Sequence, residues 1–148
     1  MYSFIFRCKN AIVDTKVYWG EVLDMRNIQA FCDKWIAMFA DENINYIDLV
    51  ERYMGDECAA LGFEMDCGHA FEEQYGMASH DVMALRGVID EVTDMALLGS
   101  AVFSRWRYFN HWAYSGDEIL APKNREWFIV ALTRLEGLAS EGSVERGM

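Results

Sequence analysis

The chain is short of proline and of positive charge, and it has no long apolar run. A single proline, with eleven glycines in 148 residues, argues against an all-β chain, whose many turns need these residues. Thirteen basic residues face twenty-four acidic ones, so the formal net charge is −11. That charge opposes direct binding to nucleic acid or to an anionic membrane. The longest apolar run, 95–103, is about half of the roughly 18–20 residues that a membrane span needs.

Cysteine is sparse as well, and the four thiols are widely spread, at Cys8, Cys32, Cys58 and Cys67. The first residues place their apolar run before their charges, which is the reverse of a secretory signal. Without an export signal, reduced and buried thiols are expected rather than disulfides. The sequence therefore predicts a cytoplasmic protein.

Apolar and aromatic residues, by contrast, are plentiful. They make up 53% and 14% of the chain, which is enough apolar surface to offset the entropy of ordering it. A chain of this length fits one domain with a substantial core. We expect that domain over residues 1–140, followed by a frayed tail over 141–148.

Apolar residues recur at spacings of three and four from about residue 27 onward, which predicts a mainly α-helical domain. About five helices are expected: 27–40, 45–61, one that starts after Ser79, 95–113 and 125–139. Residues 63–78 are irregular and acidic, and we expect a connecting loop there with at most one helical turn. Before the helices, residues 2–8 and 16–23 could form a short antiparallel β-pair, although 16–23 could also lead straight into the first helix.

Side-chain patterns also predict how these helices end and which faces they bury. Gly62 suits a left-handed cap, while Ser79 and Asn124 suit N-caps. In the second helix, five residues are expected to point inward: Ile47, Val50, Tyr53, Met54 and Leu61. In the last helix, six are expected to do so: Trp127, Phe128, Ala131, Leu132, Leu135 and Leu138.

The stretch 103–116 combines two arginines and a histidine with several aromatic residues. On a helix, Val102, Phe103, Phe109 and Asn110 gather around Trp106, while Ala101, Arg105, Tyr108 and Trp112 lie nearly opposite. A helix that is apolar on both sides is typical of a central position. Its arginines are expected to pair with carboxylates of residues 41–73 and to stack on aromatic rings.

A narrow polar strip separates those two faces, and it contains Ser104, Arg107 and His111. Arginine suits a bidentate contact to an oxyanion, and histidine can exchange a proton near neutral pH. An anion-binding site for a small molecule, or an enzyme built on Arg107 and His111, is therefore the alternative hypothesis.

Negative charge is concentrated in the middle of the chain. Residues 41–100 carry two arginines and fourteen acidic residues, a balance of −12, whereas the flanking segments balance at +1 and 0. The predicted interaction surface lies within this part of the chain: Asp56, Glu57, Glu64, Asp66, Glu72 and Glu73. Such a field attracts basic partners, although a solvated acidic surface without a partner has the same composition.

Metal and enzyme signatures are weak. Cys58, Cys67 and His69 suggest zinc, but the second paired clip that zinc sites use is absent. His80 and Asp81 suggest a metal phosphohydrolase, yet a capping role explains them equally well. No calcium loop, glycine-rich phosphate loop or nucleophile elbow occurs. No metal or other cofactor is therefore expected, and an enzyme is not indicated.

Together these patterns predict a small acidic regulatory protein that binds a protein partner with a basic surface. One form of this hypothesis is an inhibitor whose acidic face imitates the phosphates of nucleic acid and blocks a basic site. The alternatives are the anion site of Arg107 and His111 and, behind it, a metal site at Cys67 and His69. The sequence does not specify the oligomeric state.

Overall fold

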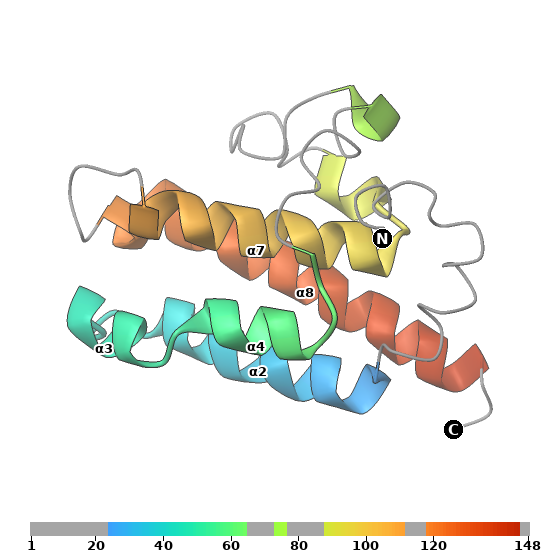
Figure 1. Cartoon of the computed structure of the whole chain (residues 1–148), viewed down its shortest axis with the longest axis horizontal. Helices are drawn as coiled ribbons and strands as arrows, with labels where there is room; N and C mark the ends of the chain where they lie inside the picture. The colour runs from blue at the N-terminus through green and yellow to red at the C-terminus, as the bar shows by residue number, and fades with distance from the viewer. Residues whose placement is uncertain (1–23, 65–72, 77–87, 112–117, 146–148) are drawn as a thin grey trace.

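A computed structural model of the chain describes residues 24–64, 73–76, 88–111 and 118–145, and these ranges are mainly helical (Figure 1). They contain α2 (Met25–Ala40), α3 (Tyr46–Glu51), α4 (Met54–Ala60), α7 (Met95–His111) and α8 (Pro122–Glu145), with short 3-10 helices η2 (Ile89–Glu91) and η3 (Glu118–Leu120). The mainly α-helical prediction is confirmed, and no strand occurs within these ranges. The predicted β-pair of 2–8 and 16–23 lies outside them.

Helix α2 matches its predicted range of 27–40 closely. It begins two residues earlier because the Asp24 carboxylate caps it, accepting hydrogen bonds from the amides of Arg26 at 3.0 Å and Asn27 at 3.3 Å. Six side chains spaced by about one turn are buried: Met25, Ile28, Phe31, Cys32, Trp35 and Phe39. This stripe supplies one wall of the core.

The helix predicted over 45–61 is divided into α3 and α4. Tyr53, between them, has φ 19° and ψ 86°, which no helix accommodates. The break allows Leu49 and Met54 to be buried together, whereas Ile47 is 67% exposed and Tyr53 is 45% exposed. The inward prediction is therefore right for Met54 and wrong for Ile47 and Tyr53. Gly62 has φ 92°, as the predicted left-handed cap requires.

Part of the helix predicted after Ser79 lies within the described residues. There Ile89 begins the 3-10 turn η2, and the chain becomes extended at Val92, with both side chains fully buried. Ser79 and Asp81 lie outside the described ranges. Asp94 then starts α7, because its carboxylate accepts a hydrogen bond from the amide of Leu97 at 3.1 Å.

Helix α7 is buried on two sides, as its sequence predicts. Val102 and Trp106 are buried on one side, and Ala101 and Arg105 on the other. Tyr108 departs from that pattern, since it is 41% exposed. The helix therefore lies between neighbours along most of its length and faces solvent near its C-terminal end.

Helix α8 begins at Pro122 and continues to Glu145, so it is longer than the predicted 125–139 and includes part of the segment expected to fray. Asn124 is not its N-cap. It lies in the first turn, where its side-chain amide donates to the Glu118 carbonyl at 2.9 Å and secures η3 instead. All six residues predicted to point inward are buried: Trp127, Phe128, Ala131, Leu132, Leu135 and Leu138.

Helices α2 and α8 run in opposite directions and form the main helix–helix interface (Figure 1). Along it, the Gln29 amide donates to the Ser140 hydroxyl at 3.0 Å, and the Phe39 ring stacks on Phe128 with centroids 4.6 Å apart. At one end, the Arg125 guanidinium donates to two backbone carbonyls, that of Phe39 at 3.0 Å and that of Asp41 at 2.7 Å. These bonds satisfy carbonyls that the C-terminus of α2 leaves without a helical partner.

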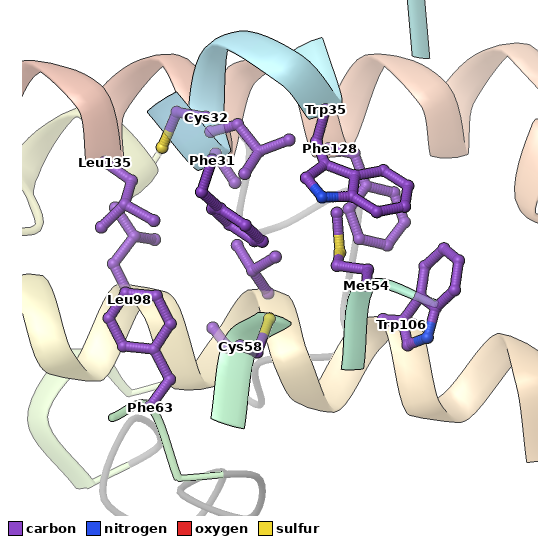
Figure 2. Packing of buried hydrophobic residues seen from close by; sticks show 14 of the residues in the cluster. Phe31, Cys32, Trp35, Met54, Cys58, Phe63, Leu98, Trp106, Phe128 and Leu135 are labelled. Atoms are coloured by element: carbon purple, nitrogen blue, oxygen red, sulfur yellow. The ribbon is translucent and has the colours of Figure 1, made fainter. Parts of the chain in front are cut away.

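The core lies where α2, α4, α7 and α8 meet (Figure 2). Trp35 of α2 packs edge-on against Trp106 of α7, with ring centroids 5.6 Å apart. Phe63, which follows α4, packs edge-on against Phe31 at 6.5 Å. None of the described helices combines the length and apolar character that crossing a membrane requires.

Candidate functional site

The predicted acidic interaction surface is only partly within the described residues. Asp56 and Glu57 lie in the first turn of α4, and Glu64 lies shortly after that helix. Asp56 and Glu73 are exposed, whereas Glu57 and Glu64 are half-buried. Asp66 and Glu72 lie outside the described ranges.

Glu57 joins α4 to α2. One of its carboxylate oxygens accepts a hydrogen bond from the Trp35 indole Nε1 at 2.8 Å, and the other pairs with the Lys34 ammonium. The same ammonium lies 5.2 Å from the centre of the Trp35 ring. Both oxygens of Glu57 therefore already have partners within the molecule, so this residue is less available to an external cation than its sequence position suggests.

Several side chains of α3, of α4 and of the turn between them are exposed, and we call this surface the α3–α4 face. Ile47 and Tyr53 are two of the three large hydrophobic side chains that the described residues expose, and the acidic Asp48 and Asp56 are also exposed there. Residues 41–64 hold seven acidic residues and a single basic one, Arg52. This face thus combines exposed apolar side chains with excess negative charge.

A groove of about 350 Å³ lies beside that face, between α2 and α4. Phe31, Ala30, Ala60 and Leu61 line it with apolar atoms, and Asn27, Lys34 and Glu57 add polar groups. Its volume lies at the lower end of the range for small-ligand sites, and its lining has the usual apolar majority. The sequence patterns did not indicate a groove, because it forms only when α4 lies against α2.

The alternative anion strip lies on α7. Arg107 is exposed, Ser104 is half-buried, and His111 is the last residue of the helix. Neither Ser104 nor Arg107 lines the groove between α2 and α4. These two residues of the strip therefore lie apart from that groove, and Arg107 faces solvent.

Arg105 is the buried arginine of α7. Its guanidinium carbon lies 4.6 Å from the centre of the Phe109 ring, 5.2 Å from that of Tyr108 and 6.0 Å from that of Trp127. The predicted stacking on aromatic rings is confirmed, and it places this arginine in the packing between α7 and α8. The expected pairing of Arg105 and Arg107 with carboxylates of residues 41–73 stays a prediction.

The metal hypotheses gain no support from the part of the chain that the structure describes. In those ranges no three His, Cys, Asp or Glu side chains gather as a metal ion would need. Cys67, His69, His80 and Asp81 fall outside them. Cys58 is buried and free, and burial, followed by the nearby Glu57 charge, raises the pKa of its thiol well above the usual value. Without a metal, such a thiol stays protonated at neutral pH.

Two acidic side chains meet at the interface of α2 and α8. Asp33 of α2 and Glu136 of α8 come within hydrogen-bonding reach, and that hydrogen bond, followed by partial burial and the Asp33 charge, raises the pKa of Glu136. No sequence pattern indicated this pair, because the two residues are 103 positions apart (136 − 33) and meet only through helix packing.

Comparisons with models of protein families, with curated proteins and with solved structures gave no match.

Proposed function

We propose that this chain binds a protein partner through the α3–α4 face and that the partner presents a basic surface. The observation that carries the proposal is the exposure of Ile47 and Tyr53 beside the acidic Asp48 and Asp56. In the proposed role the protein is cytoplasmic and regulatory, and it inhibits its partner by covering a basic site.

The exposed apolar side chains support a contact surface over a merely solvated acidic one. A branched side chain that is 67% exposed gains little burial energy in the free protein, whereas further burial against a partner stabilises the complex. Protein interfaces commonly combine apolar and aromatic centres with polar rims. Ile47 and Tyr53 would supply the centre, and the carboxylates around them would supply the rim.

The charge balance supports a basic partner. Seven acidic residues against one basic residue over 41–64 give a local balance of −6, which accelerates encounter with positive surfaces and repels negative ones. The inhibitor role extends this argument, because carboxylates placed along a surface can occupy a site that otherwise binds phosphates.

Affinity capture from host extract, with mass spectrometry, identifies the partner, and variants of the α3–α4 face then test the proposal. Asp48→Lys with Asp56→Lys should weaken the complex by about tenfold at physiological salt, and roughly 0.5 M salt should weaken the wild-type complex as well. The matched control is Asp90→Lys with Glu91→Lys, which reverses two exposed charges on η2.

Ile47→Ser tests the apolar centre, and Tyr108→Ser is its counterpart on α7. The first should weaken the complex, while the second should leave it unchanged. Capture that survives both α3–α4 changes and high salt would refute the proposal. Loss of capture in Arg107→Ala alone would favour the anion strip instead.

A further inference from the structure

The groove between α2 and α4 has a different chemistry at each end. The two helices run in opposite directions, so Lys34 and Glu57 lie together at one end while Asn27 and Leu61 lie at the other (Figure 1). Between them, Phe31 and the small side chains Ala30 and Ala60 form an apolar floor. The groove therefore offers apolar contact along its length and polar contact at its ends.

The charges at the two ends are unequal. Lys34 and Glu57 pair with each other and contribute no net charge. At the other end, the Asn27 side-chain amide donates to the Asp24 carboxylate at 3.2 Å, so the exposed negative charge of Asp24 lies beside the groove. Among the interactions of the described residues, no basic side chain pairs with this carboxylate. Asp24 also caps α2, which holds its carboxylate in place.

We propose that this groove anchors a short segment of the partner protein, and that the segment carries one apolar side chain beside one arginine or lysine. This inference rests on the proposed function and names the part of the partner that is recognised. The apolar side chain would lie against Phe31 and Leu61. The basic side chain would extend its methylene stem along the floor and place its charge at Asp24.

Other occupants fit the groove less well. A small anion would find only the Lys34 ammonium, which Glu57 already neutralises, and would be repelled by Asp24. A purely apolar ligand would leave the Asp24 charge and the chain's overall charge of −11 without a role. A basic and apolar segment matches both the floor and the charged end, and the groove is large enough for two side chains.

The probe is a displayed library of short random peptides, selected against the full chain. Peptides with an arginine or lysine next to a large apolar residue should be enriched, and synthetic copies are then titrated by fluorescence anisotropy. Enrichment of acidic or neutral peptides, or no enrichment at all, would overturn the proposal.

Variants locate the binding site of the enriched peptides. Ala60→Trp fills the groove and should weaken binding by about tenfold, whereas Ala59→Trp, also exposed on α4 but outside the groove lining, should not. Asp24→Asn removes the charge yet keeps a capping side chain, and it should weaken binding severalfold, while Asp90→Asn should have no effect. Thermal melts confirm that each variant is folded; if Ala60→Trp is not, Asp24→Asn decides alone.

The results separate this inference from the proposed function. Loss of binding with Asp48→Lys and Asp56→Lys, but not with Ala60→Trp or Asp24→Asn, would refute the groove and leave the α3–α4 face in place. Loss with the groove variants alone would support the groove and refute the contact proposed for the exposed Asp48 and Asp56. Binding unaffected by either set would refute both.

Discussion

Replacing Gly99 of α7 with alanine should destabilise the fold, although alanine is the better helix former. A methyl group on Gly99 would lie 2.4–2.5 Å from three ring atoms of Phe63, and ordinary contact begins at 3.4 Å. The ring would have to move by about 1 Å (3.4 − 2.4), yet Phe63 is only 4% exposed and packs against Phe31. Such overpacking costs about 1–3 kcal/mol.

The helical preference of alanine offsets part of that cost. Glycine is about 1 kcal/mol less favourable than alanine inside a helix. Because three ring atoms overlap at once, the upper part of the overpacking range applies, and the net loss should be about 1–2 kcal/mol. For a domain of this size the melting temperature would fall by about 2–8 °C.

Gly137 of α8 is the matched control. A methyl group there would meet nothing within 4 Å, so only the helical preference changes. Gly137→Ala should therefore stabilise the protein by about 0.5–1 kcal/mol. The two identical substitutions are expected to act in opposite directions, and the difference between them measures the Phe63 contact.

Urea unfolding followed by circular dichroism gives both free energies, and Phe63→Leu adds a second test. In the leucine background Gly99→Ala should cost less, because the smaller side chain leaves room for the methyl group. If Gly99→Ala stabilised the protein as much as Gly137→Ala does, the close packing of α7 on Phe63 would be refuted.

Three further predictions concern charge and thiols. The hydrogen bond with Asp33 raises the folded pKa of Glu136 above its ordinary 4.5. Protonated Glu136 therefore stabilises the fold fully below pH 4.5, and this stabilisation is lost as the pH rises through the folded pKa. Glu136→Gln should therefore raise the unfolding free energy at pH 7 and have less effect below pH 4.5, and equal effects at both would contradict this pairing. Arg125→Ala should cost about 1–3 kcal/mol in urea unfolding because two carbonyls at the end of α2 lose a charged donor, and a neutral result would show that these bonds contribute nothing. Burial, followed by nearby carboxylates, raises the pKa of the Cys32 thiol, and burial also raises that of Cys58. Peptide mapping should therefore find both thiols unalkylated by iodoacetamide in the native protein and alkylated in denaturant. Rapid labelling of the native protein would refute their burial.

The long helices could be predicted from the sequence because each has a sustained apolar stripe. In α2 and in residues 124–139 of α8 every turn contributes a buried residue, and the packing of one helix on the other agrees with that pattern. The burial of α7 on two sides could also be predicted, because Ala101 and Arg105 lie opposite Trp106 on a helical wheel.

The short helices could not be predicted in the same way. The pattern over 45–61 is compatible with one helix, and the break at Tyr53 arises because Leu49 and Met54 both reach the core only when the axis turns. Asparagine is a common N-cap residue, but the Asn124 side-chain amide donates a hydrogen bond to the Glu118 carbonyl of η3 instead of capping its own helix. Tertiary contacts decided both cases.

The candidate site was partly predictable. The excess of acidic residues in 41–64 marks the α3–α4 face from composition alone. The groove could not be found in this way, because Asn27 and Leu61 belong to different helices and become neighbours only after packing. Glu57 illustrates the limit of charge counting, since Lys34 and Trp35 already occupy its carboxylate.

The pairing of α2 with α8 has a consequence for biosynthesis. α2 leaves the ribosome long before α8 does, so Trp35 and Phe39 have no cover from α8 while the residues between the two helices are made. Contacts between segments so distant in sequence form late and slow the folding of the whole domain. During that interval the apolar stripe of α2 is a binding site for chaperones and a starting point for aggregation.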